Sequence, residues 1–175
     1  MDTQGNGDIF YSDFSTNRFQ EVTHLDDKKI NTNDWETHAT VTPDGQRMYF
    51  VSNRKGGMGG RDIYYSVKQK DGSWGTPVNA GPNINGPMDE ESPFVSIDNS
   101  TLYFSSNGNK SMGGFDIFMS KADGNGQWGP AINLGAPINS TCDDLFYTTT
   151  VDGLTGYMTS VRLDGKGEKD IYEIR

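Results

Sequence analysis

The sequence predicts an all-β protein built from β-propeller blades, each a sheet of four antiparallel strands. A short motif returns along the 175-residue chain: segment 59–64 (GGRDIY) reappears as segment 113–118 (GGFDIF). The aspartates of this motif stand 54 residues apart, at Asp8, Asp62, Asp116 and Asp170. A fixed period of this size with strand-like segments inside it is typical of propellers and other repeat arrays.

Other landmarks keep the same spacing. The pair Ile-Asn recurs at 30–31, 84–85 and 138–139. The composition agrees with short strands and tight turns, because the chain has 22 glycines and 11% aromatic residues but only 33% hydrophobic residues.

Each repeat divides into four expected strands, A to D. Strand A is expected at 37–42, 92–97 and 146–151, and strand B at 47–52, 101–106 and 156–161. A glycine-rich B–C loop follows, then strand C with the Asp-Ile-Tyr motif, then strand D near 74–79 and 128–134. Four such strands cannot bury both faces of their sheet alone, so blades must stack around an axis.

The domain prediction is a single propeller segment over residues 1–175. It comprises complete blades at 31–84 and 85–138 and partial blades at 1–30 and 139–175. Propellers usually have about 4–8 blades, so the ring is incomplete within one chain. Either the segment belongs to a longer propeller, or two chains complete each other's split blades as a homodimer.

Charge and hydropathy exclude several classes of partner. The formal net charge of −9 disfavours nucleic acid, whose phosphates need clustered Lys and Arg. No apolar run approaches the roughly 20 residues that span a bilayer, so we expect no direct membrane insertion. The single cysteine, Cys142, excludes an intrachain disulfide and a multi-cysteine zinc site.

The repeated residues are interpreted as structural. Equivalent positions in successive blades spread around a ring instead of converging on one substrate. The structural set comprises Asp8, Asp62, Asp116, Asp170, Trp74 and Trp128. A glycosidase would need two carboxylates roughly 5–10 Å apart in a pocket, and no such pair stands outside the repeats. We therefore predict no catalytic residue, no cofactor and no enzymatic activity.

Acidic residues recur in the D–A connection that precedes strand A. Glu36, Glu90 and Asp144 hold equivalent positions and could form an acidic rim that attracts Ca²⁺ or a basic peptide. Alternatively they cap turns and pair with basic residues of neighbouring B–C loops, namely Arg54, Lys55, Arg61 and Lys110. Trp35 stands where the other repeats carry aspartate. The candidate partner-binding residues are Trp35, Glu36, Asp89, Glu90, Asp143, Asp144, Arg54 and Lys55.

The motifs resemble a known family. Segments 43–45 (PDG), 49–54 (YFVSNR), 57–60 (GMGG) and 62–64 (DIY) are similar to the WD40-like PD40 repeats of TolB-like β-propellers, and most closely to propellers of OmpA-type cell-envelope proteins of Bacteroidota. The resemblance implies a non-catalytic scaffold or protein-interaction module, periplasmic or associated with the outer membrane. Its partners would be other envelope or peptidoglycan-associated proteins. A carbohydrate-active or other hydrolytic propeller, and a fragment that closes its ring by oligomerising, are the alternatives.

Overall fold

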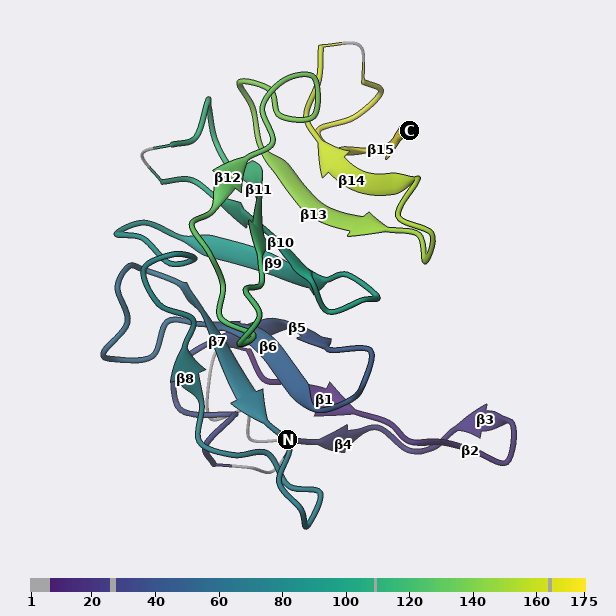
Figure 1. The fold of residues 1–175 in the computed structure, drawn as a ribbon. Coiled ribbons are helices and arrows are strands. Elements are labelled where there is room, and N and C mark those ends of the chain that lie inside the picture. The colour runs from purple at the N-terminus through teal and green to yellow at the C-terminus, as the bar shows by residue number, and fades with distance from the viewer. Residues whose placement is uncertain (1–6, 26–27, 109, 164) are drawn as a thin grey trace.

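The computed structural model is all-β, as the repeats predict, and it describes residues 7–25, 28–108, 110–163 and 165–175. Within those ranges the chain forms fifteen β-strands and no helix, and hence no helix in them is long and apolar enough to cross a membrane. Figure 1 shows the sheets stacked one upon another from the N-terminal to the C-terminal part of the chain. The strands of each sheet pair in antiparallel fashion, as a chain that returns through short turns dictates.

Two sheets are complete blades of four strands. The 31–84 blade has the order β5-β6-β7-β8, and the 85–138 blade has the order β9-β10-β11-β12. Their bounds are Glu36–Val41 (β5), Arg47–Ser52 (β6), Asp62–Val67 (β7), Val78–Asn79 (β8), Glu90–Val95 (β9), Thr101–Ser106 (β10), Asp116–Lys121 (β11) and Ile132–Asn133 (β12).

A partial blade lies at each end of the described chain. The 139–175 blade has three strands in the order β13-β14-β15, and in the 1–30 blade β1 pairs with β4. Their bounds are Asp144–Thr149 (β13), Gly156–Ser160 (β14), Asp170–Ile174 (β15), Phe10–Tyr11 (β1) and Thr23–His24 (β4). The predicted fold class is confirmed, including a ring that does not close within the chain.

A small hairpin between β1 and β4 is an addition that the repeat does not predict. β2 (Phe14–Ser15) pairs with β3 (Arg18–Phe19), where the complete blades have only an isolated bridge that ends at Trp74 or Trp128. Phe19, one position before the repeat equivalent of Trp74 and Trp128, therefore takes the place of these tryptophans in pairing but not in packing. It is 74% exposed, whereas both tryptophans pack against buried clusters.

The first strand of each blade begins earlier than the sequence predicts, by one residue in β5 and by two in β9 and β13. A β-bulge interrupts the pairing of this strand. Next to it His38, Ser92 and Phe146 adopt positive φ angles of 47°, 53° and 57°, the left-handed geometry that accompanies one extra residue in a ladder. As a consequence, Glu36, Glu90 and Asp144, which were expected in the D–A connections, are the first residues of the strands.

The hydrophobic core lies between blades, as stacking requires. One buried cluster joins the 31–84 blade to the 85–138 blade through Tyr49, Val51, Ile63, Ile84, Val95, Leu102, Phe104 and Phe118. A second joins the 1–30 blade to the 31–84 blade through Ile30, Met48, Phe50 and Tyr64, with Ile9, Leu25 and Trp74 packed against it. Burying apolar area between neighbouring sheets is the main stabilising term of such an array.

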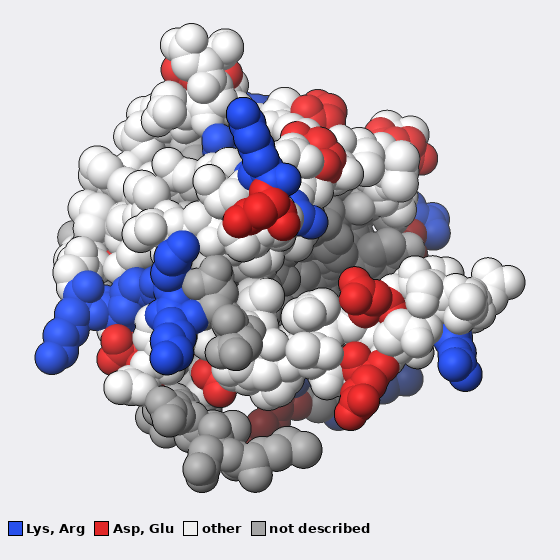
Figure 2. All heavy atoms as spheres, turned by 90° about the horizontal axis from the view of Figure 1, so that it is seen from below, with Lys and Arg blue, Asp and Glu red and all other residues white. Residues whose placement is uncertain are grey.

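The last blade leaves one face uncovered. Tyr157 and Ile171 are 39% and 77% exposed, whereas their equivalents Tyr49 and Ile63 are 1% and 0% exposed beneath the next blade. At the opposite end of the stack, which Figure 2 views from below, acidic and basic side chains are interspersed among uncharged ones.

Candidate functional site

Two sets of loops meet at one end of the blades. We call this end the loop face; it comprises the B–C loops 53–61 and 107–115 and the D–A connections 80–89 and 134–143. Arg61 forms a parallel bridge with Asp89, and Glu90 N donates to Arg61 O at 2.8 Å. The connection that enters one blade therefore binds the B–C loop of the preceding blade.

The repeated aspartates of the third strand bind within their own blades. Backbone N–H groups of the adjoining B–C loop donate to Asp62, Asp116 and Asp170, with shortest distances of 2.5–2.6 Å. Asp8 lies 3.3 Å from His24 Nε2. In this arrangement each aspartate fixes a local segment of chain, and the four are distributed over four blades.

The recurrent asparagine of the D–A connection joins consecutive segments. Asn85 Nδ2 donates to Ile63 O at 2.9 Å, and Ile63 N donates to Asn85 Oδ1 at 2.9 Å. Asn31 and Asn139 make the same pair of bonds one repeat before and one repeat after. Because these asparagines are buried, both bonds satisfy groups that water cannot reach.

Two of the candidate partner-binding residues, Asp89 and Asp143, face the preceding B–C loop. Asp89 accepts from Arg61 N at 3.0 Å and from Arg61 Nη2 at 2.9 Å, and Asp143 accepts from Phe115 N at 3.2 Å. A Cβ at Gly60 or Gly114 would lie 2.4 or 2.2 Å from the facing carboxylate. The second glycine of each Gly-Gly pair is thus required by this close approach.

Trp35 replaces that aspartate in the 31–84 blade. Its indole faces Gly7, where a Cβ would lie 2.7 Å from Nε1, and the Arg61 guanidinium lies 5.4 Å from its ring centroid. Trp35 is half-buried between Gly7 and Arg61. A cation over an indole ring is a favourable contact.

Arg61 belongs to a group of side chains that occurs once in the described residues. The second guanidinium nitrogen of Arg61 pairs with Glu91, whose other carboxylate oxygen lies 2.5 Å from His38 Nδ1. The ring of His38 in turn meets that of Phe146 edge-on at 5.0 Å. We call Trp35, His38, Arg61, Asp89 and Glu91 the Arg61 cluster; it connects the 31–84 and 85–138 blades at the loop face.

Glu36, at the start of β5, is buried against an arginine of its own blade. It accepts from Thr32 N at 2.8 Å, from Thr32 Oγ1 at 2.9 Å and from Ser52 Oγ at 2.8 Å, and Arg54 Nη2 lies 3.2 Å from it. Asp144 has a comparable environment, with Ser140 N and Oγ as donors and Arg162 Nη2 at 3.6 Å.

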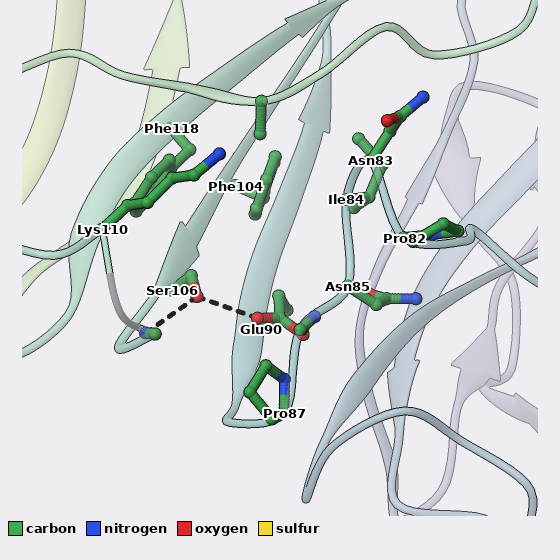
Figure 3. Close-up of a pocket in the computed structure, with 13 residues that line it drawn as sticks. Pro82, Asn83, Ile84, Asn85, Pro87, Glu90, Phe104, Ser106, Lys110 and Phe118 are labelled. Carbon is green, nitrogen blue, oxygen red and sulfur yellow. Dashed lines mark hydrogen bonds between the residues drawn. The ribbon is translucent and has the colours of Figure 1, made fainter.

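Glu90 is the exception. It is 1% exposed and accepts from Gly86 N at 3.0 Å and from Ser106 Oγ at 2.8 Å, but no Lys, Arg or His of the described chain forms an ion pair with it. Burial without a counter-charge raises the pKa of Glu90 to about 7. Beside it lies a cavity of about 240 Å³, which Figure 3 shows between Phe104, Phe118, Ile84 and Glu90.

The expected acidic rim is therefore a buried layer. Glu36, Glu90 and Asp144 are 1%, 1% and 0% exposed, because the bulged first strand carries them beneath the loops. Within the described ranges, no group of three or more His, Cys, Asp or Glu side chains is placed to hold a metal ion. Of the other candidates, Arg54 is half-buried against Glu36, and Lys55 is exposed.

The sequence contained a signal for the Glu90 cavity that the motif analysis missed. Positions 54, 108 and 162 are separated by one repeat each, and they read Arg, Gly and Arg. Position 86 is likewise glycine where its equivalents are Thr32 and Ser140. In contrast, the Arg61 cluster joins residues of β5, of β9 and of the loops beside them, and no local pattern connects these residues.

Neither a protein-family model nor a curated protein matches the sequence. Among solved structures, TolB from Acinetobacter baumannii superimposes with a TM-score of 0.59 over 88% of this chain, at 17% sequence identity. The chain spans about a third of that protein's length, since the match covers 32% of it. At this identity the similarity establishes a TolB-like β-propeller fold.

Proposed function

We propose that the chain is a non-catalytic interaction module that binds partner proteins through the loop face. The observation that supports this proposal is the location of the residues that differ between equivalent positions of the repeats. Arg61, Asp89 and the two glycines beside Glu90 lie at the loop face, and the other members of the Arg61 cluster adjoin it. The strands beneath keep one pairing scheme from blade to blade. Loops on a rigid β scaffold are the usual carriers of recognition.

The kind of partner follows from the resemblance of the repeat motifs to envelope propellers. The proposed partners are other envelope or peptidoglycan-associated proteins, with the module in the periplasm or associated with the outer membrane. The TolB-like fold is consistent with this assignment, although one fold hosts many functions.

A matched pair of charge reversals tests the loop face. Lys55 and Lys70 are both exposed, but Lys55 lies in a B–C loop and Lys70 in a C–D turn at the other end of the blade. We expect Lys55→Glu to reduce capture of envelope proteins from a Bacteroidota envelope extract, as quantified by mass spectrometry, and Lys70→Glu to leave it unchanged. Equal capture by both variants would contradict the assignment of the face.

The hydrolytic alternative has its own test. On a panel of glycan and ester substrates we expect no turnover above buffer. Turnover that disappears on replacing one carboxylate, with the fold retained, would replace the interaction module by an enzyme.

Self-completion of the ring is a second candidate role, because the exposed face of the last blade is otherwise equivalent to a covered one. Tyr157 and Ile171 present the positions that a following blade covers elsewhere. A covering element with the chemistry of another blade fits that face, and a second copy of the chain can supply it. We expect light scattering to give the mass of a dimer, and a monomer at all concentrations would exclude this role.

A further inference from the structure

The arginine at position 54 fills a defined receptor where its own blade meets the preceding one. Arg54 Nε donates to Ser52 Oγ at 3.0 Å, and its two terminal nitrogens donate to Lys29 O at 3.0 Å and Ile30 O at 2.8 Å. The guanidinium also lies 5.0 Å from the ring centroids of Phe50 and Tyr64. With Glu36 as the counter-charge, the receptor offers a hydroxyl, two carbonyls, two aromatic faces and a carboxylate.

The same receptor recurs two repeats later, in the 139–175 blade, and it again holds an arginine. Arg162 Nε donates to Ser160 Oγ at 3.1 Å, and its terminal nitrogens donate to Pro137 O at 3.0 Å and Ile138 O at 2.5 Å. Its guanidinium lies 5.0 Å from the Tyr172 ring centroid. The agreement of both geometries shows that the repeat is built to hold a guanidinium at this place.

The 85–138 blade keeps the receptor and lacks the arginine. Gly108 stands at the equivalent position, while Ser106, Phe104 and Phe118 remain in place of Ser52, Phe50 and Tyr64. The two rings stack at 5.8 Å, close to the 6.2 Å of the ring pair that flanks Arg54. Ser106 Oγ still binds the carboxylate at 2.8 Å, as Ser52 Oγ does.

The carbonyl groups of the receptor are also present. Asn83 and Ile84 occupy the positions of Lys29 and Ile30 and line the cavity. Asn83 O accepts from Ala131 N at 3.1 Å, which leaves its second lone pair. In the described part of the chain no donor is found for Ile84 O. The cavity of about 240 Å³ thus coincides with the volume that an arginine side chain occupies in the two neighbouring repeats.

The chemistry of the cavity selects one kind of cation. A guanidinium is planar, donates up to five hydrogen bonds in a fixed fork and stacks on aromatic rings, which matches the two carbonyls and the ring pair. Calcium takes six to eight oxygen ligands, and aromatic walls supply none. An ammonium is more strongly hydrated than a guanidinium and lacks its fork.

We propose that the cavity beside Glu90 binds the guanidinium group of an arginine side chain presented by a partner protein, in the position that the chain's own arginines fill in the neighbouring repeats. The inference rests on the proposed function as an interaction module. Binding supplies the counter-charge that a buried carboxylate otherwise lacks, because pairing offsets the desolvation cost of Glu90.

The charges around Glu90 favour an incoming cation. Asp62 and Asp89 both raise the pKa of Glu90 through their negative charge. Lys110 lines the cavity, and in Figure 3 its ammonium end points away from the hydrogen bond between Ser106 and Glu90. Lys110 forms no ion pair with Glu90 in the described residues, so the carboxylate remains available.

A capped amino acid tests the site directly. The probe is N-acetyl-arginine amide at pH 8, where Glu90 is ionised, followed through the backbone amide signals of Gly86 and Gly108 in NMR spectra. We expect a saturating shift with a dissociation constant on the order of millimolar, as suits a small ligand. The neutral isostere N-acetyl-citrulline amide is expected to give no saturating shift, and N-acetyl-lysine amide to bind at least about tenfold more weakly.

Two variants locate the binding, each with a matched control. Glu90→Gln removes the counter-charge and is expected to weaken binding at least about tenfold, whereas Glu168→Gln removes an exposed charge and leaves binding unchanged. Gly108→Arg is expected to abolish binding by filling the cavity. Gly124→Arg adds the same charge at an exposed glycine whose Cβ would meet nothing within 4 Å, and it leaves binding unchanged. Unfolding midpoints of all four variants verify that they are folded.

The outcomes separate this inference from the proposed function. Three results would overturn the proposed guanidinium site and leave the cavity a packing defect of one repeat. They are the absence of a saturating shift with the arginine probe, equal binding of the lysine probe, and binding that is retained in Gly108→Arg. Tighter binding of free L-arginine than of the capped residue would overturn the protein source in favour of a small molecule. If N-acetyl-arginine amide does not bind but Lys55→Glu still reduces capture, the proposed interaction module stands without this site. If the chain turns over a substrate, the proposed interaction module is wrong, whether or not N-acetyl-arginine amide binds.

Discussion

The 31–84 and 85–138 blades carry the same sheet and differ beside one buried carboxylate. Both have four strands in the same order, and both bury a glutamate at the start of the first strand. Glu36 has Arg54 and a threonine hydroxyl, whereas Glu90 has neither, because glycine occupies both equivalent positions. The sheet is held by bonds elsewhere, such as the asparagine pairs, so this electrostatic site can change without changing the blade.

The largest effect should come from making the first blade resemble the second. Arg54→Gly leaves Glu36 buried without its cation and also removes the contacts with two rings. We expect the free energy of unfolding to fall by about 3–5 kcal/mol, the usual cost of breaking a buried pair from one side. Urea unfolding monitored by tryptophan fluorescence measures it.

The exposed neighbour provides the control for that experiment. Lys55→Gly introduces the same residue one position further along the loop, at an exposed side chain, and should cost less than about 1 kcal/mol. If Arg54→Gly were equally mild, the arginine would not be the group that stabilises Glu36, and the comparison of the two blades would lose its basis.

The second effect is a pH dependence that belongs to the 85–138 blade. Because the pKa of Glu90 is about 7 in the folded chain and lower when unfolded, the folded state binds the proton more tightly. Stability is therefore highest below the unfolded pKa and falls as pH rises from about 5 to about 7, by about 2–3 kcal/mol. Urea titrations of the parent chain and of Glu90→Gln between pH 5 and pH 8 measure the difference.

The difference in unfolding free energy between the parent chain and Glu90→Gln isolates the contribution of Glu90 from those of other titrating groups. The pKa values of Asp44 and Asp98 are lowered by hydroxyl and backbone donors, so these groups act at lower pH and cancel between the two proteins. Parallel curves for the parent and the variant would show that Glu90 titrates normally and is not deprived of a counter-charge.

The repeat period predicted the blades well because hydrophobic spacing and turns are local properties. It placed β6 and β10 at their observed bounds and identified the third strand by its aspartate. The start of the first strand was misplaced, since nothing in His38, Ser92 or Phe146 signals a positive φ. That bulge decides whether the acidic residues line a rim or are buried.

Only part of the candidate site could be predicted from the sequence. The contrast of Arg54 with Gly108 lies in the sequence at the repeat interval, but its meaning depends on burial of the carboxylate by loops of the preceding blade. The Arg61 cluster depends on contacts of Arg61 with Trp35 and Asp89 and of His38 with Glu91, between residues 26 or more positions apart, which periodicity does not encode. Equivalence of positions is predictable from the sequence, whereas the environment of each position requires the stacked blades.

The third prediction restores the missing arginine. A Cβ at Gly108 would meet only Ser106 Oγ, at 3.3 Å, and no positive φ is required there. Gly108→Arg should place its guanidinium against Glu90 and raise the free energy of unfolding at pH 8 by about 1–2 kcal/mol, as charge-assisted hydrogen bonds do. Gly124→Arg should change it by less than about 0.5 kcal/mol, and a destabilised Gly108→Arg would show that the receptor does not accept the group.

The smallest expected effect concerns a tyrosine that the two blades share but use differently. Tyr49 OH accepts from Trp128 Nε1 at 3.0 Å and from Arg47 Nη1 at 3.1 Å, so it links the first complete blade to the last strand region of the second. Tyr103 is its equivalent one repeat later; among the described residues its hydroxyl has no hydrogen-bond partner, and its ring meets Tyr147 at 4.9 Å. Tyr49→Phe leaves two donors without their acceptor and should lower the free energy of unfolding by about 1 kcal/mol, whereas Tyr103→Phe should be nearly neutral. Thermal and urea unfolding of both variants test this, and an equal loss in both would mean that the ring, and not the hydroxyl between blades, carries the stabilisation.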